Sequence, residues 1–472
     1  MEFKDTCGEL VVEKDCVVGV ANEAFTPEFM TGMGAAFGTT LKTTDIVLMG
    51  RDFRYDSRML KRCFTAGLIA TGVSTFDFHA ISGSVLQFLI RRFGASAGVL
   101  FASSHSIPNG IEIRIFDDLG VEISKDQIQD FLNLLLIPTC ASIRRIPPEQ
   151  IGHILVPPET ENIYRTALTK VVNTKTISQM RSTVAVDCSL SPVSQIIPSL
   201  LSEMNFKVIS LNSFRPVHIP EVLPNNLSLA MLTKSIIATD SDLGMVFGQQ
   251  GSCVHFIDNS GNFIEPSEVA TLLALERIQQ AGEVEKVIVI SEYLGERAQQ
   301  AIEDAGATIK TVDVTVNSLP QVIRRYRAIF GAADDGSYYY PAFSPGRDCI
   351  LTSFYLLNIL AEREQRFSQL VHPYAHQRTE STKKLSDLQE VLNKLGTMRF
   401  SEFKILDTII GYKFIFPDGG WVHLRPTRML DICRMIGQGG ENSTEEELFS
   451  NVNNTLEKIQ DQITYEKEEK TQ

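Results

Sequence analysis

A polar turn at residues 102–110 follows a short apolar run and holds the side chains best suited to covalent chemistry. Ser104 and His105 are adjacent in it, directly after a strand predicted at 98–102. A serine hydroxyl on such a loop can act as a nucleophile or carry a phosphoryl group, with the histidine polarising it. The same pair is also compatible with a purely structural turn, so the residues alone leave both interpretations open.

The elements that must position this turn alternate between apolar runs and amphipathic stretches. With 472 residues, the chain is long enough for several domains. Short β-branched runs and helical periodicity predict strands at 45–49, 183–187, 207–211 and 286–290, and helices at 58–70 and 295–305. Three successive blocks of this kind predict three α/β domains with mixed, largely parallel sheets.

The composition changes near the C-terminal end of the third block. Residues 372–384 are polar and predict a linker to a smaller unit. Pro417-Asp418-Gly419-Gly420 predicts a hairpin turn between two strands. Residues 444–463 place Leu448, Val452, Leu456 and Ile459 on one side of a helix, which we expect to pack on the last domain.

The overall charge and the cysteine pattern exclude several classes of protein. A formal net charge of −13 argues against nucleic acid as a partner, because phosphate binding needs a concentrated basic surface. No apolar run has the length of a membrane span and the start shows no signal pattern, so we expect a cytoplasmic protein with no membrane partner. The eight cysteines are scattered, without a CxxC pair, and are expected to be reduced.

Six landmarks, in chain order, resemble the α-D-phosphohexomutase family of phosphoglucomutases and phosphomannomutases. They resemble the family's TPE, GRDxRxSS, TASHNPxxxNGIK, PEPNPENL, FxPGRDG and DGSWVLVRP segments, and lie at 26–29, 50–57, 102–112, 220–227, 343–348 and 418–426. The resemblance implies four domains, three mixed α/β and a smaller C-terminal α+β domain. It divides the chain at 1–156, 157–254, 255–370 and 371–472.

The resemblance also implies roles for individual residues. Ser104 matches the family's phosphoryl-carrying serine, with His105, Arg51 and Arg54 as further catalytic residues, active or vestigial. The start of the chain lacks the family's opening loop. Glu112 stands where the family has Lys, which reverses a charge beside the site.

The family's metal loop, FDGDADR, aligns with Phe247–Cys253. Gly248, Gln250 and Ser252 replace its three aspartates, and Cys253 replaces its arginine. Because Mg²⁺ favours anionic oxygen ligands, the resemblance predicts no metal here and no cofactor, with Mg²⁺ expected only if the protein is active.

The other two ligand loops of the family are also altered. In the sugar-binding FGGExSG segment, Ala333 replaces Glu and Asp335 replaces Ser, so no sugar-binding residue is predicted. The phosphate-binding RPSGTEPxxR loop is partly kept. Its remaining arginines could bind a phosphate, because guanidinium groups suit phosphate oxygens. Its predicted phosphate-binding residues are Arg425, Thr427, Arg428 and Arg434.

Two functional interpretations follow from the resemblance. The first is an inactive or impaired phosphohexomutase-like protein of carbohydrate metabolism that binds a phosphosugar or acts as a regulatory or partner subunit. Its partners would be a phosphosugar, a second copy of the chain, or an active paralogue. The alternative is an active mutase that uses Ser104 on an unusual phosphosugar.

Overall fold

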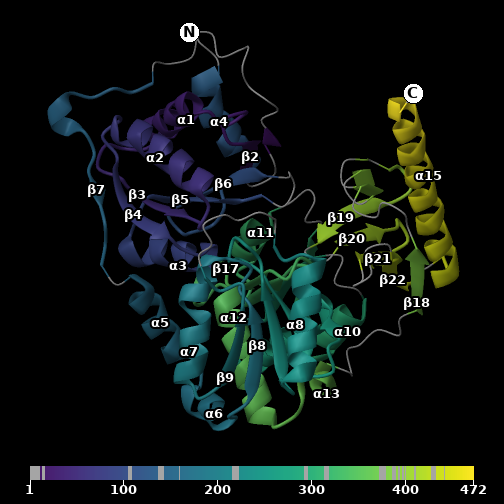
Figure 1. The fold of residues 1–472 in the computed structure, drawn as a ribbon. Coiled ribbons are helices and arrows are strands. Elements are labelled where there is room, and N and C mark those ends of the chain that lie inside the picture. Colours follow the sequence, from purple (N-terminus) through teal and green to yellow (C-terminus); the bar gives the residue numbers. More distant parts are fainter. Residues whose placement is uncertain are drawn as a thin grey trace.

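The computed structural model describes residues 11–12, 16–104, 109–136, 143–158, 160–214, 223–291, 296–312, 318–371, 379–384, 390–391, 394–395, 398, 400–408, 411–426, 432–440 and 442–471. Its four sheets occupy four parts of the molecule, with the first and fourth on either side above the second and third (Figure 1). This arrangement confirms the predicted α/β class. No helix in the described residues combines the length and apolarity needed to cross a bilayer.

The first sheet has seven strands in the order β1-β2-β6-β5-β3-β4-β7. The strands are β1 (Val11–Val12), β2 (Cys16–Val20), β3 (Ile46–Arg51), β4 (Ser74–Ala80), β5 (Ala97–Ser103), β6 (Gly110–Phe116) and β7 (Ile154–Leu155). The helices α1 (Pro27–Thr40), α2 (Tyr55–Ile69) and α4 (Lys125–Leu136) share one apolar core with the sheet. β3 runs parallel to β4 and β5, so the chain leaves β3 and β5 at the same edge.

The helix α3 (Gly83–Phe93) lies on the opposite face of this sheet. Its Leu86, Leu89 and Ile90 are buried in a core that continues without interruption into the second and third parts of the molecule. Gly94, in the left-handed conformation that glycine adopts without a steric penalty, ends the helix. Helix α3 therefore fixes the first sheet to the rest of the chain.

The predicted start of α2 was wrong. The periodicity predicts the helix at 58–70, but α2 begins at Tyr55, three residues earlier. The carboxylate of Asp52 accepts the backbone N–H of Arg54 at 2.9 Å and turns the chain into the helix earlier than the apolar pattern indicates.

The second and third sheets have five strands each, ordered β12-β11-β10-β8-β9 and β14-β13-β15-β16-β17. The strands are β8 (Thr183–Asp187), β9 (Lys207–Leu211), β10 (Leu243–Phe247), β11 (Val254–Asp258), β12 (Phe263–Ile264), β13 (Val287–Ser291), β14 (Thr308–Val312), β15 (Phe330–Ala332), β16 (Tyr338–Tyr340) and β17 (Ser344–Arg347). Their helices are α5 (Thr160–Val171), α6 (Thr174–Gln179), α7 (Ile197–Glu203), α8 (Asn226–Ala238), α9 (Pro266–Gln280), α10 (Glu296–Asp304), α11 (Leu319–Arg325), α12 (Cys349–Arg363) and α13 (Phe367–Val371).

The predicted division at residue 254 falls inside a strand. β11 begins at Val254 and pairs antiparallel with β10, and β12 extends the same sheet to Ile264. The second sheet therefore continues ten residues beyond the predicted division, which only the hydrogen-bond pairing reveals.

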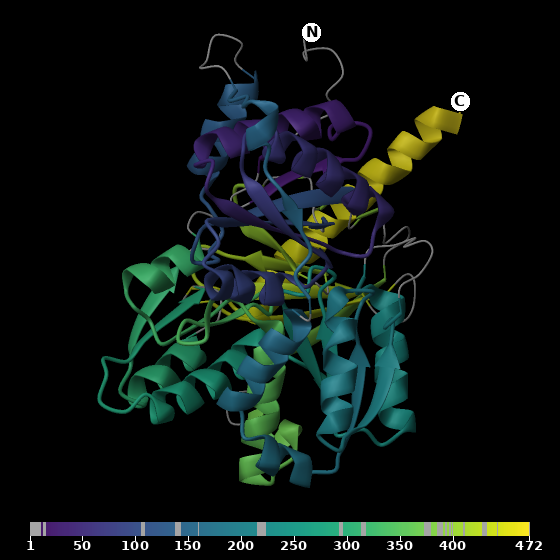
Figure 2. The ribbon, with the colours of Figure 1, turned by 90° about the vertical axis from the view of Figure 1, so that its left-hand side faces the viewer.

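The fourth sheet, in the order β18-β22-β21-β20-β19, lies at one side of the molecule (Figure 1) and behind the first sheet in the turned view of Figure 2. Its strands are β18 (Thr379–Lys384), β19 (Lys404–Thr408), β20 (Gly411–Ile415), β21 (Trp421–Pro426) and β22 (Ile432–Gln438). The predicted hairpin is confirmed: β20 pairs with β21, and Gly419 has the positive φ that the turn needs. Leu448, Val452, Leu456 and Ile459 of α15 (Glu445–Thr471) pack on this sheet as expected.

The linker predicted at 372–384 is wrong in its second half. Residues 379–384 form β18, which pairs antiparallel with β22 along six residues. The sequence TESTKK is polar because β18 is an edge strand, stabilised by its backbone ladder.

The carboxylate of Asp348 joins the start of α12 to α5. It caps α12 by accepting the N–H of Leu351 at 2.9 Å, and it accepts the hydroxyl of Tyr164 in α5 at 2.7 Å. Burial raises the pKa of Asp348 to about 6, because the surroundings disfavour the charged form.

We expect Asp348→Asn to change how stability depends on pH. A carboxyl group whose pKa is higher in the folded state stabilises the fold below its unfolded pKa and loses this contribution as pH rises towards about 6. The free energy of unfolding of the wild type should fall relative to that of the variant between pH 4 and 7, by up to about 3 kcal/mol. Urea unfolding at several pH values measures this difference, and parallel curves would contradict the assignment.

Candidate functional site

The predicted serine lies at the end of β5, at the edge where β3 also ends. Ser104 is 1% exposed, and its backbone N–H donates to the carbonyl of Gly110 at 2.9 Å. His105 lies outside the described residues, so the structure does not test its predicted role.

The carboxylate of Asp52 forms hydrogen bonds with backbone and side-chain groups at this edge of the sheet. Its Oδ2 accepts both the backbone N–H and the hydroxyl of Ser103, at 2.8 and 3.0 Å. Burial raises the pKa of Asp52, and the surrounding hydrogen bonds oppose the shift. The residue before Ser104 is thus held by a buried carboxyl group, a contact that the sequence prediction missed.

The two predicted arginines are brought to the same place. Arg51 donates from Nη1 to the carbonyl of Asp52 at 2.6 Å. Arg54 pairs with Asp56 and donates from Nη2 to the carbonyl of Asn109 at 3.1 Å, so it reaches across the mouth of the serine turn. The structure therefore gathers Arg51, Arg54 and Ser104, with both guanidinium groups engaged by protein atoms.

The loop Phe247–Cys253 packs directly against the serine turn. The amide Nε2 of Gln250 donates to the carbonyl of Ser103 at 3.3 Å, and the hydroxyl of Ser252 donates to Oε1 of Gln250 at 3.4 Å. The amide of Gln250 therefore links the loop Phe247–Cys253 to the residue before Ser104.

The backbone of this loop also meets the start of α3. The N–H of Gly83 donates to the carbonyl of Gln250 at 2.9 Å, and the N–H and hydroxyl of Ser84 donate to that of Gly251 at 3.3 and 2.8 Å. The first N–H groups of a helix have no partner within the helix and attract anions. Here two of them are used by neutral carbonyl groups.

The residues present do not fit a magnesium ion. The loop supplies only neutral side-chain oxygens, and those of Gln250 and Ser252 bond to each other. Within the described residues, no group of three or more His, Cys, Asp or Glu side chains is arranged to hold a metal. Gln249 is 2% exposed, and its amide forms no hydrogen bond with the described part of the chain.

Cys253, in the position of the family's arginine, is not an activated thiol. Burial raises the pKa of Cys253 to about 12, and the negative charge of Asp335 adds to the shift. Because the thiolate is the nucleophilic form, this residue is unreactive near neutral pH.

A chain of alternating charges crosses from the first to the third sheet beside the loop. Arg114 pairs with Glu112 and lies 3.9 Å from Oε1 of Glu122, which is 3.4 Å from Nε of Arg347. Arg347 in turn lies 3.9 Å from Asp335. Three carboxylates face two guanidinium groups, so these five side chains favour no additional anion.

The altered sugar loop makes a contact that sequence comparison missed. Ala333 is buried in an apolar cluster, and Asp335 accepts the N–H of Ser337 at 2.9 Å. The intervening Asp334 forms an ion pair with Lys413 of β20 at 2.9 Å, with both side chains 4% exposed. The sugar loop therefore fastens the fourth sheet to the third.

Lys413 belongs to a polar patch on the inward face of the fourth sheet. Its Nζ lies 4.3 Å from the centre of the Trp421 ring, and its cross-strand partner His423 approaches Glu265 at 4.0 Å. The sequence offered one signal for this ion pair. A lysine at an inward-facing position of a strand indicates a buried acidic partner, because a charged side chain is buried only when it is paired.

The predicted phosphate loop is described only at its two ends. Arg425 and Arg434 are directly opposite each other in the ladder of β21 and β22. Thr427 and Arg428 lie outside the described residues.

Comparison with known proteins supports the predicted family and fold. A family model described as "Phosphoglucomutase/phosphomannomutase, alpha/beta/alpha domain I" matches residues 12–135. The chain is 28% identical to a phosphoglucomutase/phosphomannomutase of Thermococcus kodakarensis, covering 89% of this chain and 93% of that one. It is 26% identical to a probable phosphoglucosamine mutase of Pyrococcus horikoshii, covering 93% and 96%. The fold matches a putative phosphomannomutase structure from Thermus thermophilus with a TM-score of 0.74, at 18% identity and covering 95% and 100%.

We expect the buried pair to dominate the attachment of the fourth sheet. Lys413→Met or Asp334→Asn leaves one buried partner without its counterpart, which costs about 3–5 kcal/mol of unfolding free energy. The double variant should lose clearly less than the sum of the two. The fluorescence of Trp421, the single tryptophan, reports unfolding from beside Lys413.

Lys383→Met is the matched control in the same sheet. Lys383 pairs with Glu457, which is largely exposed, so this change should cost at most about 1 kcal/mol. Equal losses in Lys413→Met and Lys383→Met would contradict the importance of the buried pair.

Proposed function

The chain belongs to the α-D-phosphohexomutase family, and we propose that it has lost mutase catalysis and keeps the fold to bind a phosphosugar. The observation that carries this proposal is the contact of Gln250 with Ser103. An uncharged, internally bonded loop lies where the family's metal loop would face the phosphoryl-carrying serine.

The absence of charged side chains in the loop Phe247–Cys253 explains why we expect no phosphoryl transfer. A phosphoryl group in transfer spreads negative charge over its oxygens, and enzymes lower the barrier mainly by positioning and by placing positive charge nearby. Here the loop Phe247–Cys253 has no charged side chain. Arg54 is hydrogen-bonded to Asp56 and Asn109, and the neighbouring charge chain contains more carboxylates than guanidinium groups.

Two features support retained binding of a phosphosugar. Arg425 and Arg434 are opposite each other in the β21–β22 ladder, which brings two guanidinium-bearing residues to one end of the sheet. The enclosed amide of Gln249 can both donate and accept a hydrogen bond, as a sugar hydroxyl requires.

The alternative is an active mutase that uses Ser104 on an unusual phosphosugar. It is favoured by the gathering of Arg51, Arg54 and Ser104 at one sheet edge, and by the names of the relatives, which are mutases.

Activity assays separate the two. We expect no turnover of glucose 1-phosphate, mannose 1-phosphate or glucosamine 1-phosphate in the presence of Mg²⁺ and a bisphosphate primer, and no phosphate on Ser104 in the intact mass spectrum. Turnover that disappears in Ser104→Ala would establish the alternative and reject the proposal.

Restoring the carboxylates tests the loop itself. We expect the triple variant Gly248→Asp, Gln250→Asp, Ser252→Asp to unfold at a lower temperature than the wild type, because three like charges lie close together. Millimolar Mg²⁺ should recover part of the loss in the variant and leave the wild type unchanged, as thermal unfolding will show. A Mg²⁺-dependent shift in the wild type would mean that this chain holds the ion by other groups.

Phosphosugar binding is tested by thermal shift with the same three sugar phosphates. We expect a rise in the unfolding temperature of the wild type that is strongly reduced in Arg425→Ala, with Arg145→Ala, an exposed arginine of the first part of the chain, as the control. If no sugar phosphate shifts the wild type, binding is rejected, and an assembly role with a second copy or an active paralogue becomes the interpretation to pursue.

A further inference from the structure

A groove of about 910 Å³ lies beside the C-terminal half of α3. It lies between α3, α5 and the turn that joins β16 to β17, so all of the first three parts of the chain meet there. We propose that this groove binds a nucleoside phosphate, with the base against its aromatic floor and the phosphates against its cations.

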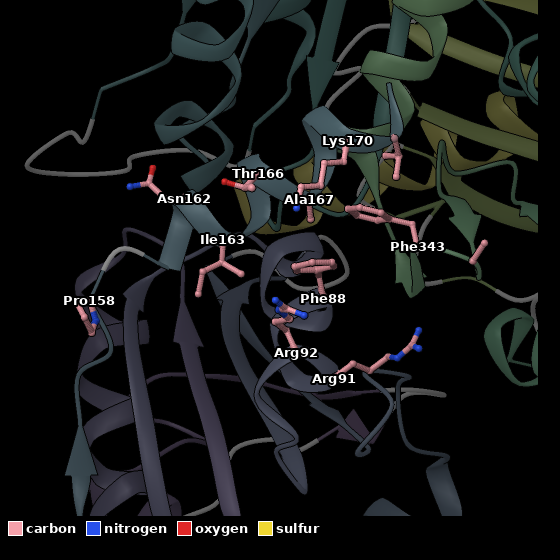
Figure 3. A pocket seen from close by; sticks show the side chains of 12 residues that line it. Phe88, Arg91, Arg92, Pro158, Asn162, Ile163, Thr166, Ala167, Lys170 and Phe343 are labelled. Atoms are coloured by element: carbon pink, nitrogen blue, oxygen red, sulfur yellow. The ribbon is translucent and has the colours of Figure 1, made fainter. Parts of the chain in front are cut away.

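The floor is aromatic. Phe88 of α3 stacks on Phe343, with ring centres 4.9 Å apart and an angle of 19° between the planes. Tyr164 meets both rings edge-on from below, at 5.3 and 5.8 Å. Figure 3 shows the two phenylalanine rings in the middle of the groove, with Ile163 beside them. These side chains form a rigid apolar surface on which a planar base can stack.

The rim is cationic. Arg91 and Arg92 occupy the last turn of α3, Lys170 occupies the last turn of α5, and all three are exposed. In the described part of the chain none of them forms an ion pair, and no carboxylate is among the residues that line the groove. In Figure 3, Arg92 and Lys170 lie on opposite sides of the phenylalanine pair.

The position of these cations at helix ends has an ordinary explanation that is not sufficient here. A positive side chain in the last turn of a helix is stabilised by the helix dipole. The helix dipole accounts for each cation separately. It does not explain why the ends of two helices place three cations around one groove in a protein whose net charge is −13. A concave surface lined by one sign of charge concentrates ligands of the opposite sign.

The volume of the groove, its aromatic floor and its cationic rim together indicate which class of ligand fits it. A volume of about 910 Å³ is at the upper end of the range for small-molecule sites, ample for a nucleotide. A sugar phosphate would leave the phenylalanine pair uncovered, and an uncharged aromatic molecule would leave the cations unused. A nucleoside phosphate satisfies both, through stacking and through guanidinium–phosphate hydrogen bonds.

The groove is connected to the serine turn through a single helix. The C-terminal end of α3 borders the groove, while its first residues, Gly83 and Ser84, hold the loop that contacts Ser103. The eleven residues of α3 separate the two ends by about 16 Å. A ligand that joins α3 to α5 and Phe343 therefore stiffens the support of the distant loop without touching it.

Calorimetric titration of the full chain with AMP and ATP, without metal, tests the proposal. We expect saturable binding of both, at least tenfold weaker binding in Arg92→Glu and in Lys170→Glu, and unchanged binding in Lys234→Glu, an exposed charge reversal on α8. Both groove variants should stay folded, with an unfolding temperature only slightly below that of the wild type, because the exposed side chains lose no more than their interaction with the helix dipole. Excess glucose 1-phosphate should not displace AMP, which separates this groove from the phosphosugar site.

Adenosine and inorganic tripolyphosphate complete the experiment. Each should bind at least tenfold more weakly than ATP, because each uses only half of the groove. No saturable binding of AMP or ATP, or equal binding in the charge-reversed variants, would overturn the proposal. So would tripolyphosphate binding as tightly as ATP, or displacement of ATP by a short poly-glutamate peptide at equal concentration, which would identify the groove as a site for an acidic segment.

Discussion

The attachment of α3 is the constraint on which the rest of the molecule depends. Its apolar face is part of a core that runs from the first sheet into the second and third, so these parts cannot separate without exposing buried side chains. Its first N–H groups are bonded to the carbonyls of Gln250 and Gly251, which sets the distance between the serine turn and the opposing loop. The geometry of the candidate site is therefore determined by how this helix is held.

The loops that differ from the family's ligand loops are parts of the internal support of the fold. Gln250 bonds to Ser103, and Asp334 bonds to Lys413. Each contact joins a loop to a neighbouring strand or sheet by groups that, in an open site, would face ligand and solvent. Buried pairs of this kind stabilise only when both members are present, so such contacts are retained as units.

Sequence alone predicted the strands that are short β-branched runs, whether buried like β8 or partly exposed like β9. β8 and β9 were predicted to the residue, because short apolar runs between polar ends leave little freedom in the boundaries. β18 was missed because an edge strand needs no apolar side chains, and the start of α2 was missed because a side chain of the preceding turn decides it. At the site, the sequence indicated Ser104, Arg51 and Arg54 but not Asp52 or Lys413. Asp52 and Lys413 act through contacts with Ser103 and Asp334, which lie about 50 and 80 positions away in the sequence.

The backbone conformation and the surroundings of Gly251 restrict which residue can stand at this position. Gly251 stands at the alanine of the family's metal loop, and its φ of +64° is one that other residues rarely adopt. A Cβ atom there would lie 2.6 Å from Cβ of Ser82, at the entry to α3. Alanine at this position would require the backbone and α3 to move apart. Because α3 is buried in the core that joins the first three sheets, the packing of that core, and not only the turn itself, restricts position 251 to glycine.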